Sequence, residues 1–119
     1  MDKFMFEKLE VYQKSLDLIG KVIDVSRKLP PEIRYSLGSH LIETAVSVSN
    51  NIAEGCGRRG KKEKRQFYNI AQGSSFECVP MITVLERKKF ISQDEFNILY
   101  DGCYRVSQML SRLIASVEC

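Results

Sequence analysis

The stretch "SQDEFNILYDGCYRVSQMLSRLIASV", residues 92–117, decides the fold class. Its apolar side chains recur every three or four positions, which is the spacing of one face of an α-helix. These positions are Phe96, Leu99, Cys103, Val106, Leu110, Leu113 and Val117. Ser92 and Glu95 match a capping box, in which each side chain bonds the backbone N–H of the other residue at a helix start. The stretch therefore predicts a long helix with a seam suited to antiparallel packing.

A first helical segment is expected over about residues 6–29. Pro30 and Pro31 end it, because proline has no backbone N–H and restricts the residue before it. One stripe follows Leu9, Tyr12, Leu16, Ile19 and Ile23, and a second set widens it: Val11, Leu18, Val22, Val25 and Leu29. A face this broad predicts contact with more than one neighbour.

A second segment runs from these prolines to Gly55 or Gly57, and a third from about residue 61 to residue 88. The stripe of the second is Leu37, Leu41, Thr44, Val48 and Ile52, and that of the third is Phe67, Ile70, Ser74, Met81 and Leu85. The glycines are expected to mark a joint, since glycine accepts a left-handed backbone after a helix. In the third segment, "AQGSS" predicts a close helix approach, and Pro80 predicts a kink.

Four amphipathic helices with short connections predict an all-α protein, an antiparallel up-down-up-down four-helix bundle. A single domain over residues 1–119 fits the length. No window reaches the roughly 18 apolar residues of a membrane span, and no signal peptide is visible. We therefore expect a cytoplasmic protein without a membrane partner. Its cysteines are then expected to be free thiols: Cys56, Cys78, Cys103 and Cys119.

The stretch "NNIAEGCGRRGKKEKRQF", residues 50–67, concentrates positive charge. Glu63 is the only opposing charge within a run that holds Arg58, Arg59, Lys61, Lys62, Lys64 and Arg65. Cations at a helix start oppose the helix dipole, which suggests that they serve another purpose. Such a patch can contact phosphates. Phe67 falls on the predicted core stripe, so Tyr68 is the candidate for stacking on a base. The alternative is a solvated run without a ligand.

Two carboxylates in this region need partners. Glu54 ends the second segment, where the dipole disfavours it, and Arg58 is the nearest cation. Glu77 falls on or beside the inner stripe of the third segment and needs hydrogen bonds if it is buried. We therefore expect a structural polar network of Asn51, Glu54, Arg58 and Glu77.

Residues for catalysis or metal binding are not apparent. A di-iron bundle uses two Glu-x-x-His motifs, and His40 is the only histidine. "GCGRRGKK" lacks the spacing of a phosphate-binding loop, and no serine has a histidine at an arguable spacing. No metal, no cofactor and no enzymatic activity are expected.

Three stretches together resemble a known family: "FEKLEVYQKSLDL" at residues 6–18, "SVSNNIAEGCGRRGKKEKRQFYNIAQGSSFE" at residues 47–77, and the capped last helix. They are similar to the four-helix-bundle family named after the S23 ribosomal protein, whose founding members are encoded by intervening sequences within bacterial 23S ribosomal RNA genes. The family's central motif resembles S-[IV]-P-x-N-I-A-E-G-x-G-R, then a basic stretch, F-x-x-[IL]-A-x-G-S and a glutamate. It is matched here by Ser47, Val48, Asn51, Ile52, Ala53, Glu54, Gly55, Gly57, Arg58, Phe67, Ile70, Ala71, Gly73, Ser74 and Glu77. The chain departs from the family at Ser49 and Cys56, where proline and an aromatic residue are common.

The resemblance implies a left-handed bundle that assembles as a ring-like homopentamer. It also implies a relation to the accessory protein of diversity-generating retroelements, a pentameric basic bundle that binds a reverse transcriptase and nucleic acid. Two hypotheses follow. The protein is a non-enzymatic oligomeric accessory protein that binds RNA or DNA through the basic stretch, or it is an oligomeric protein-interaction scaffold without a nucleic-acid ligand.

Overall fold

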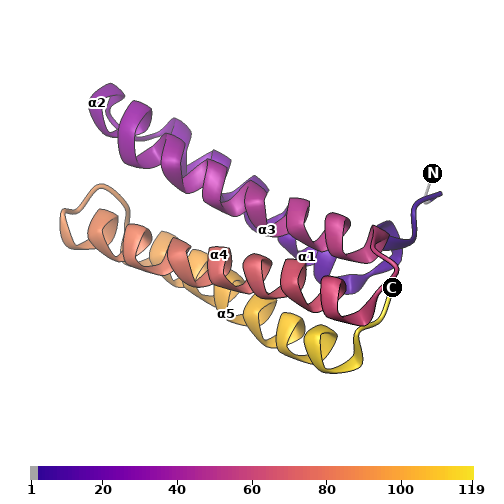
Figure 1. Ribbon diagram of the computed structural model, residues 1–119. Helices are drawn as coiled ribbons and strands as arrows, with labels where there is room; N and C mark the ends of the chain where they lie inside the picture. The colour runs from indigo at the N-terminus through magenta and orange to yellow at the C-terminus, as the bar shows by residue number, and fades with distance from the viewer. Residues whose placement is uncertain (1–2) are drawn as a thin grey trace.

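Four long helices run side by side in alternating directions in the computed structural model, which describes residues 3–119 (Figure 1). They are α1 (Glu10–Arg27), α3 (Ser39–Gly57), α4 (Lys61–Arg87) and α5 (Gln93–Ser116). α3 packs between α1 and α4, and α5 packs between α4 and α1. The predicted up-down-up-down bundle is confirmed. The predicted domain starts at residue 1, so its first two residues lie outside the described part of the chain.

Short helical pieces complete the chain. The 3-10 helix η1 (Met5–Lys8) precedes α1, and α2 (Pro31–Ile33) continues into a π-helical stretch, η2 (Arg34–Gly38), that leads into α3. The first helix was predicted to begin near residue 6, but extended backbone at Leu9 separates η1 from α1. Glu7 accounts for part of this break, since its carboxylate accepts the Phe4 N–H at 3.1 Å and closes η1 as a separate turn.

The core of α1 lies on the second of the two predicted sets. Leu16 is exposed, whereas the buried side chains repeat with helical spacing. These are Val11, Ser15, Leu18, Val22, Val25 and Leu29. Burial of a leucine or valine side chain stabilises the fold by about 1.5–3 kcal/mol. This set, with the seams of α3, α4 and α5, therefore forms the continuous core of the bundle.

The predicted stripe of α4 is wrong over the first half of the helix. Ile70 is 51% exposed and Phe67 is half-buried, whereas Tyr68 is fully buried. The observed seam repeats at four and three residues and consists of Lys64, Tyr68, Ala71, Ser75, Cys78, Ile82 and Leu85. The helix is continuous through Pro80, which is exposed.

The capping box of α5 is confirmed. Ser92 Oγ accepts the Glu95 N–H at 3.0 Å, and a Glu95 carboxylate oxygen accepts the Ser92 N–H at 2.9 Å. The other Glu95 oxygen bonds Lys28 Nζ at 2.6 Å, and this hydrogen bond lowers the pKa of Glu95. The contact joins the end of α1 to the start of α5. Within residues 3–119, no helix is both long enough and apolar enough to cross a membrane.

Candidate nucleic-acid interface

The connection between α3 and α4 is only three residues long, and the predicted site lies in it and in the first turns of α4. α3 ends at Gly57, and α4 begins at Lys61 after Gly60. None of the glycines in the described chain has a positive φ. The expected left-handed glycine at the joint is therefore wrong. Arg58 ends α3 with extended backbone, and its N–H bonds the Gly55 carbonyl oxygen at 3.1 Å.

Arg58 is held against the joint by two contacts. Its guanidinium donates to the Glu54 carboxylate at 3.0 Å, as the sequence predicted. Its Cζ atom lies 4.8 Å from the centre of the Phe67 ring, which is a cation–π distance. Phe67 thus supports an arginine at the surface and does not fill the core.

The other exposed cations of the basic run lie at the same end of the bundle, in the connection and at the start of α4. Arg59, Lys61, Lys62 and Arg65 are exposed, and among the described residues none of them forms a salt bridge. With Arg58 they make up what we call the basic joint. The first turn of α4 has no side-chain cap, so its backbone N–H groups add to the positive field of these side chains.

Lys64 and Tyr68 do not belong to this surface, which corrects two of the predicted contacts. Lys64 is only 9% exposed, and its ammonium bonds the carbonyl oxygens of Gly55 at 3.4 Å, Cys56 at 2.9 Å and Cys119 at 3.2 Å. The first two are carbonyls of the last turn of α3. A buried ammonium is therefore stabilised by hydrogen bonds and by the negative end of the α3 dipole.

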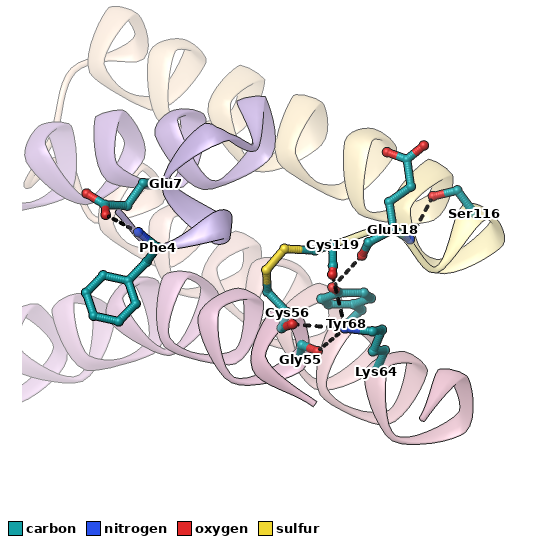
Figure 2. Close-up of a disulfide and its surroundings, with 9 residues drawn as sticks. All are labelled: Phe4, Glu7, Gly55, Cys56, Lys64, Tyr68, Ser116, Glu118 and Cys119. Carbon is teal, nitrogen blue, oxygen red and sulfur yellow. Dashed lines mark hydrogen bonds between the residues drawn. A yellow bond between two sulfur atoms is a disulfide. The ribbon is translucent and has the colours of Figure 1, made fainter. Parts of the chain in front are cut away.

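Tyr68 fills the core one turn further along α4. Its side chain is fully buried, and its hydroxyl donates to the Glu118 carbonyl oxygen at 2.8 Å (Figure 2). Burial raises the pKa of Tyr68 to about 12. The ring lies against Gly55, where an added Cβ would come within 2.6 Å of Tyr68 Cε1. The helices approach too closely at Gly55 for any side chain there. The other two joint glycines have room for a Cβ: at Gly57 it would meet nothing within 4 Å, and at Gly60 it would lie 3.6 Å from a Glu63 oxygen.

A disulfide links Cys56 to Cys119, so the prediction of free thiols is wrong for these two residues. α3 and α5 run in the same direction, and both end beside the joint (Figure 1). Cys56 lies in the last turn of α3, and Cys119 follows α5 by three residues. Their Cα atoms are 4.9 Å apart, within the range that a disulfide spans.

Cys78 and Cys103 are free thiols, as predicted, and both are buried. They lie on the facing seams of α4 and α5. The hydrogen bond with Cys103 and burial raise the pKa of Cys78. Cys78 therefore stays protonated and packs as a small apolar side chain.

The predicted polar network divides into separate contacts. Glu77 is exposed on α4 and lies 3.3 Å from the ring of His40, far along α3 from the joint. Asn51 donates to the carbonyl oxygen and the hydroxyl of Ser47, at 2.8 and 3.1 Å. Only the Glu54–Arg58 pair is formed as predicted. Glu77 was misplaced because the α4 seam runs through Cys78 and leaves the preceding residue outside.

Small residues on α4 allow close contacts with both neighbouring helices. The Ser74 hydroxyl lies 3.0 Å from that of Ser47 on α3. The Ser75 hydroxyl donates to the Cys103 carbonyl oxygen at 2.9 Å and lies 2.9 Å from the Ser107 hydroxyl on α5. The close approach predicted from "AQGSS" is confirmed through its two serines.

An apolar groove of about 320 Å³ runs between the outer faces of α4 and α5. Phe76 and Tyr104 are 58% and 56% exposed there, and Tyr100 lies beside them. The groove is lined by Gln72, Phe76, Val79, Tyr100, Cys103, Tyr104, Ser107, Gln108 and Ser111. None of these side chains is charged. Within the described chain, no three His, Cys, Asp or Glu side chains are grouped as a metal ion would require.

The fold and the site together define a small four-helix bundle with a basic end. The family model of the 23S rRNA-intervening sequence protein matches residues 7–112, and the chain belongs to this family. The resemblance seen in the sequence is thus confirmed. No curated protein sequence matches the chain.

A solved structure shows the same fold. It is the crystal structure of a protein with unknown function from the S23 ribosomal protein family, from Bacteroides thetaiotaomicron VPI-5482. The match has a TM-score of 0.81 and 17% sequence identity, and covers 87% of this chain and 97% of that chain. At this identity the likeness establishes the fold alone.

Proposed function

We propose that this protein is a non-enzymatic, oligomeric accessory protein that binds nucleic acid through the basic joint. One observation carries the proposal: Arg59, Lys61, Lys62 and Arg65 are exposed at one end of the bundle and none forms a salt bridge within the described chain. Cations that are not neutralised within the protein are available to phosphates, and their binding releases counterions.

The surroundings of these cations support the same reading. The connection is short and ends in two long helices, so the charges stand on a rigid element and not on a long loop. Glu54 is paired with Arg58, which leaves Glu63 as the acidic residue nearest to the free cations in sequence. The stacking contact expected from Tyr68 is not part of the proposal, because that ring is buried. Recognition would rest on the phosphate backbone and on shape.

The choice of first ligand comes from the family. Its description refers to an intervening sequence of 23S ribosomal RNA, so a structured fragment of that RNA is the first probe, with a DNA duplex of matched length beside it. A preference between them would separate an RNA-binding from a DNA-binding role. A protein partner such as a reverse transcriptase, which the resemblance implies, would be sought with the bound nucleic acid present.

Fluorescence anisotropy at several salt concentrations tests the proposal. We expect binding that weakens with salt and a variant with Arg59, Lys61, Lys62 and Arg65 changed to Gln that loses most of it. Each lost phosphate contact should reduce the slope of log affinity against log salt by about 0.9 for the DNA duplex, and the slope for the RNA fragment should fall in the same direction.

The matched control removes four exposed cations from the far part of the bundle by changing Lys21, Arg27, Arg87 and Lys88 to Gln. It has the same net charge as the joint variant. Binding should be retained in this control. If the two variants weaken binding equally, net charge and not the basic joint is responsible, and the proposal fails. Absence of binding at low salt overturns it outright.

A second candidate function is an oligomeric protein-interaction scaffold, and the groove between α4 and α5 favours it. Its exposed aromatic walls and uncharged rim fit the core of a protein interface, where charged residues are depleted. We propose a second copy of this chain as the occupant, because an uncharged surface lets molecules of net charge +3 approach each other without direct repulsion there. Assembly through the groove is compatible with nucleic-acid binding at the joint.

A further inference from the structure

Residues 117–119 are held against the basic end of the bundle by one covalent bond and two hydrogen bonds. The Cys56–Cys119 disulfide holds them covalently. Tyr68 donates to the Glu118 carbonyl oxygen at 2.8 Å, and Lys64 donates to that of Cys119 at 3.2 Å (Figure 2). Residues 117–119 therefore cover Lys64, the buried cation of the basic run, and Tyr68, one turn further along α4.

The backbone of this segment is not one that its residues prefer. Val117 has φ 53° and Cys119 has φ 97°. Positive φ is uncommon for residues other than glycine, and for a β-branched residue such as valine it is an outlier. Such backbone persists only where surrounding contacts hold it. The covalent bond is the strongest of the contacts that hold this segment.

We propose that the Cys56–Cys119 disulfide is a thiol-sensitive latch, which a low-molecular-weight thiol opens to release residues 117–119 and uncover Lys64 and Tyr68 beside the basic joint. The effect on nucleic acid rests on the proposed function above. The release of the segment does not.

The chemistry is thiol–disulfide exchange. A thiolate of the reductant attacks Cys119 Sγ, the bond to Cys56 Sγ breaks, and Cys56 leaves as a thiolate that takes up a proton. A second reductant thiolate then attacks the reductant sulfur of the mixed disulfide, and Cys119 leaves as a thiolate that also takes up a proton. The protein disulfide gains two electrons, and two reductant thiols become one disulfide. Cys119 is the more accessible sulfur residue, since it is half-buried and Cys56 is only 9% exposed.

The other two cysteines provide an internal contrast. Cys78 and Cys103 lie on facing helices, yet they are 1% and 2% exposed and remain thiols. Because so little of either side chain is exposed, a small oxidant or reductant in water has little access to them while the bundle is folded. The cysteine pair at the basic end of the bundle thus forms a disulfide, and the pair in the middle of the core does not.

Opening the latch changes the charge available at the joint. Without Cys119, Lys64 keeps its bonds to the Gly55 and Cys56 carbonyl oxygens, and the third N–H of its ammonium faces the space that residue 119 occupied. A phosphate oxygen can take that place. The hydroxyl of Tyr68 loses its acceptor at Glu118 and becomes accessible at the same time.

Amide hydrogen exchange of the oxidised and the dithiothreitol-treated protein tests the release directly. We expect faster exchange at residues 117–119, whereas the middle of α4 and α5 should not change. Alkylation under native conditions should label Cys56 and Cys119 and leave Cys78 and Cys103 unlabelled. The Cys119→Ser variant should show the open pattern without reductant. Identical exchange in oxidised protein, reduced protein and this variant overturns the latch.

RNA binding measured on the same samples tests the consequence. Reduced protein should bind the ribosomal RNA fragment more tightly than oxidised protein, with a steeper salt slope because one phosphate contact is added. In Lys64→Gln the two redox forms should bind alike. Equal slopes in the two forms of the unsubstituted protein overturn the gain in binding. If neither form binds at low salt, the proposed function fails, while the exchange experiment still decides whether the latch opens.

Discussion

At the scale of the residue, Lys64 belongs to the basic run in sequence, but its ammonium is buried and bonds backbone carbonyl oxygens. Two of its three carbonyl partners belong to the last turn of α3, whose C-terminal carbonyls have no partner within the helix. The charge also sits at the negative end of the α3 dipole. Removing the lysine would take this donor from the Cys56 carbonyl oxygen, whereas the Gly55 carbonyl oxygen would keep the Arg58 N–H, so the role of Lys64 is structural before it is electrostatic.

Tyr68 makes stability depend on pH in a defined range. Its pKa is about 12 in the folded protein and about 10 in an unfolded chain. Between these values the unfolded chain loses the phenolic proton first, which favours unfolding. The contribution of Tyr68 to the free energy of unfolding is therefore complete below pH 10 and falls as the pH rises towards 12. Chemical denaturation at a series of alkaline pH values measures this fall.

The control for this prediction is a comparison of two tyrosines. Tyr68→Phe should flatten the alkaline loss of stability, whereas Tyr35→Phe should not, since Tyr35 is 74% exposed. An unchanged alkaline profile in Tyr68→Phe would show that another group causes the loss.

At the scale of the element, the approach of α3 to α4 depends on Gly55. In Gly55→Ala the new Cβ would lie 2.6 Å from Tyr68 Cε1 and 2.8 Å from Tyr68 Cδ1, closer than side chains can pack. The two helices must then separate or the ring must move. We expect a loss of about 1–3 kcal/mol in the free energy of unfolding, as for other overpacked cores, measured by chemical denaturation.

Gly57→Ala is the matched control, two residues further along the same helix. An added Cβ there meets nothing within 4 Å, so the change should be neutral or stabilise by up to about 1 kcal/mol through reduced freedom of the unfolded chain. Equal effects of the two substitutions would show that helix propensity, and not the contact with Tyr68, determines the result.

The seam of each helix could be predicted from the sequence to different degrees. In α5 every seam residue is apolar apart from a serine, and the prediction was correct. In α4 the repeat counted back from Leu85 in steps of three and four passes through serine and ends at Tyr68 and Lys64. A lysine at a seam position looks like a surface residue, so the stripe through Phe67 and Ile70 was preferred.

The partners that make Lys64 acceptable could not be read from local sequence. They lie at the end of α3 and at residue 119, and they meet only once the bundle closes. The disulfide was missed for a related reason, because an expected cytoplasmic setting argued for free thiols. A usable signal did exist: in an up-down-up-down bundle the ends of the second and fourth helices lie together, and each carries a cysteine near its end.

At the scale of the whole molecule, the two candidate surfaces are separate. The basic joint lies at one end of a bundle that measures 44 × 27 × 21 Å, and the groove lies along the side formed by α4 and α5. Copies that associate through the groove would leave their joints free. Several joints in one assembly would then bind a long nucleic acid with added strength, provided that their spacing lets them engage together.

The last prediction concerns this assembly. Sedimentation velocity should give a mass that is a multiple of the 13.7 kDa chain, five-fold for the pentamer that the resemblance implies. The double variant Phe76→Glu and Tyr104→Glu should shift the protein towards monomer, because carboxylates would have to lose water in an apolar contact. Leu16→Glu, at an exposed leucine on α1, should leave the mass unchanged. A monomeric parent protein would overturn the assembly, and an oligomeric double variant with intact helical content would move the interface away from the groove.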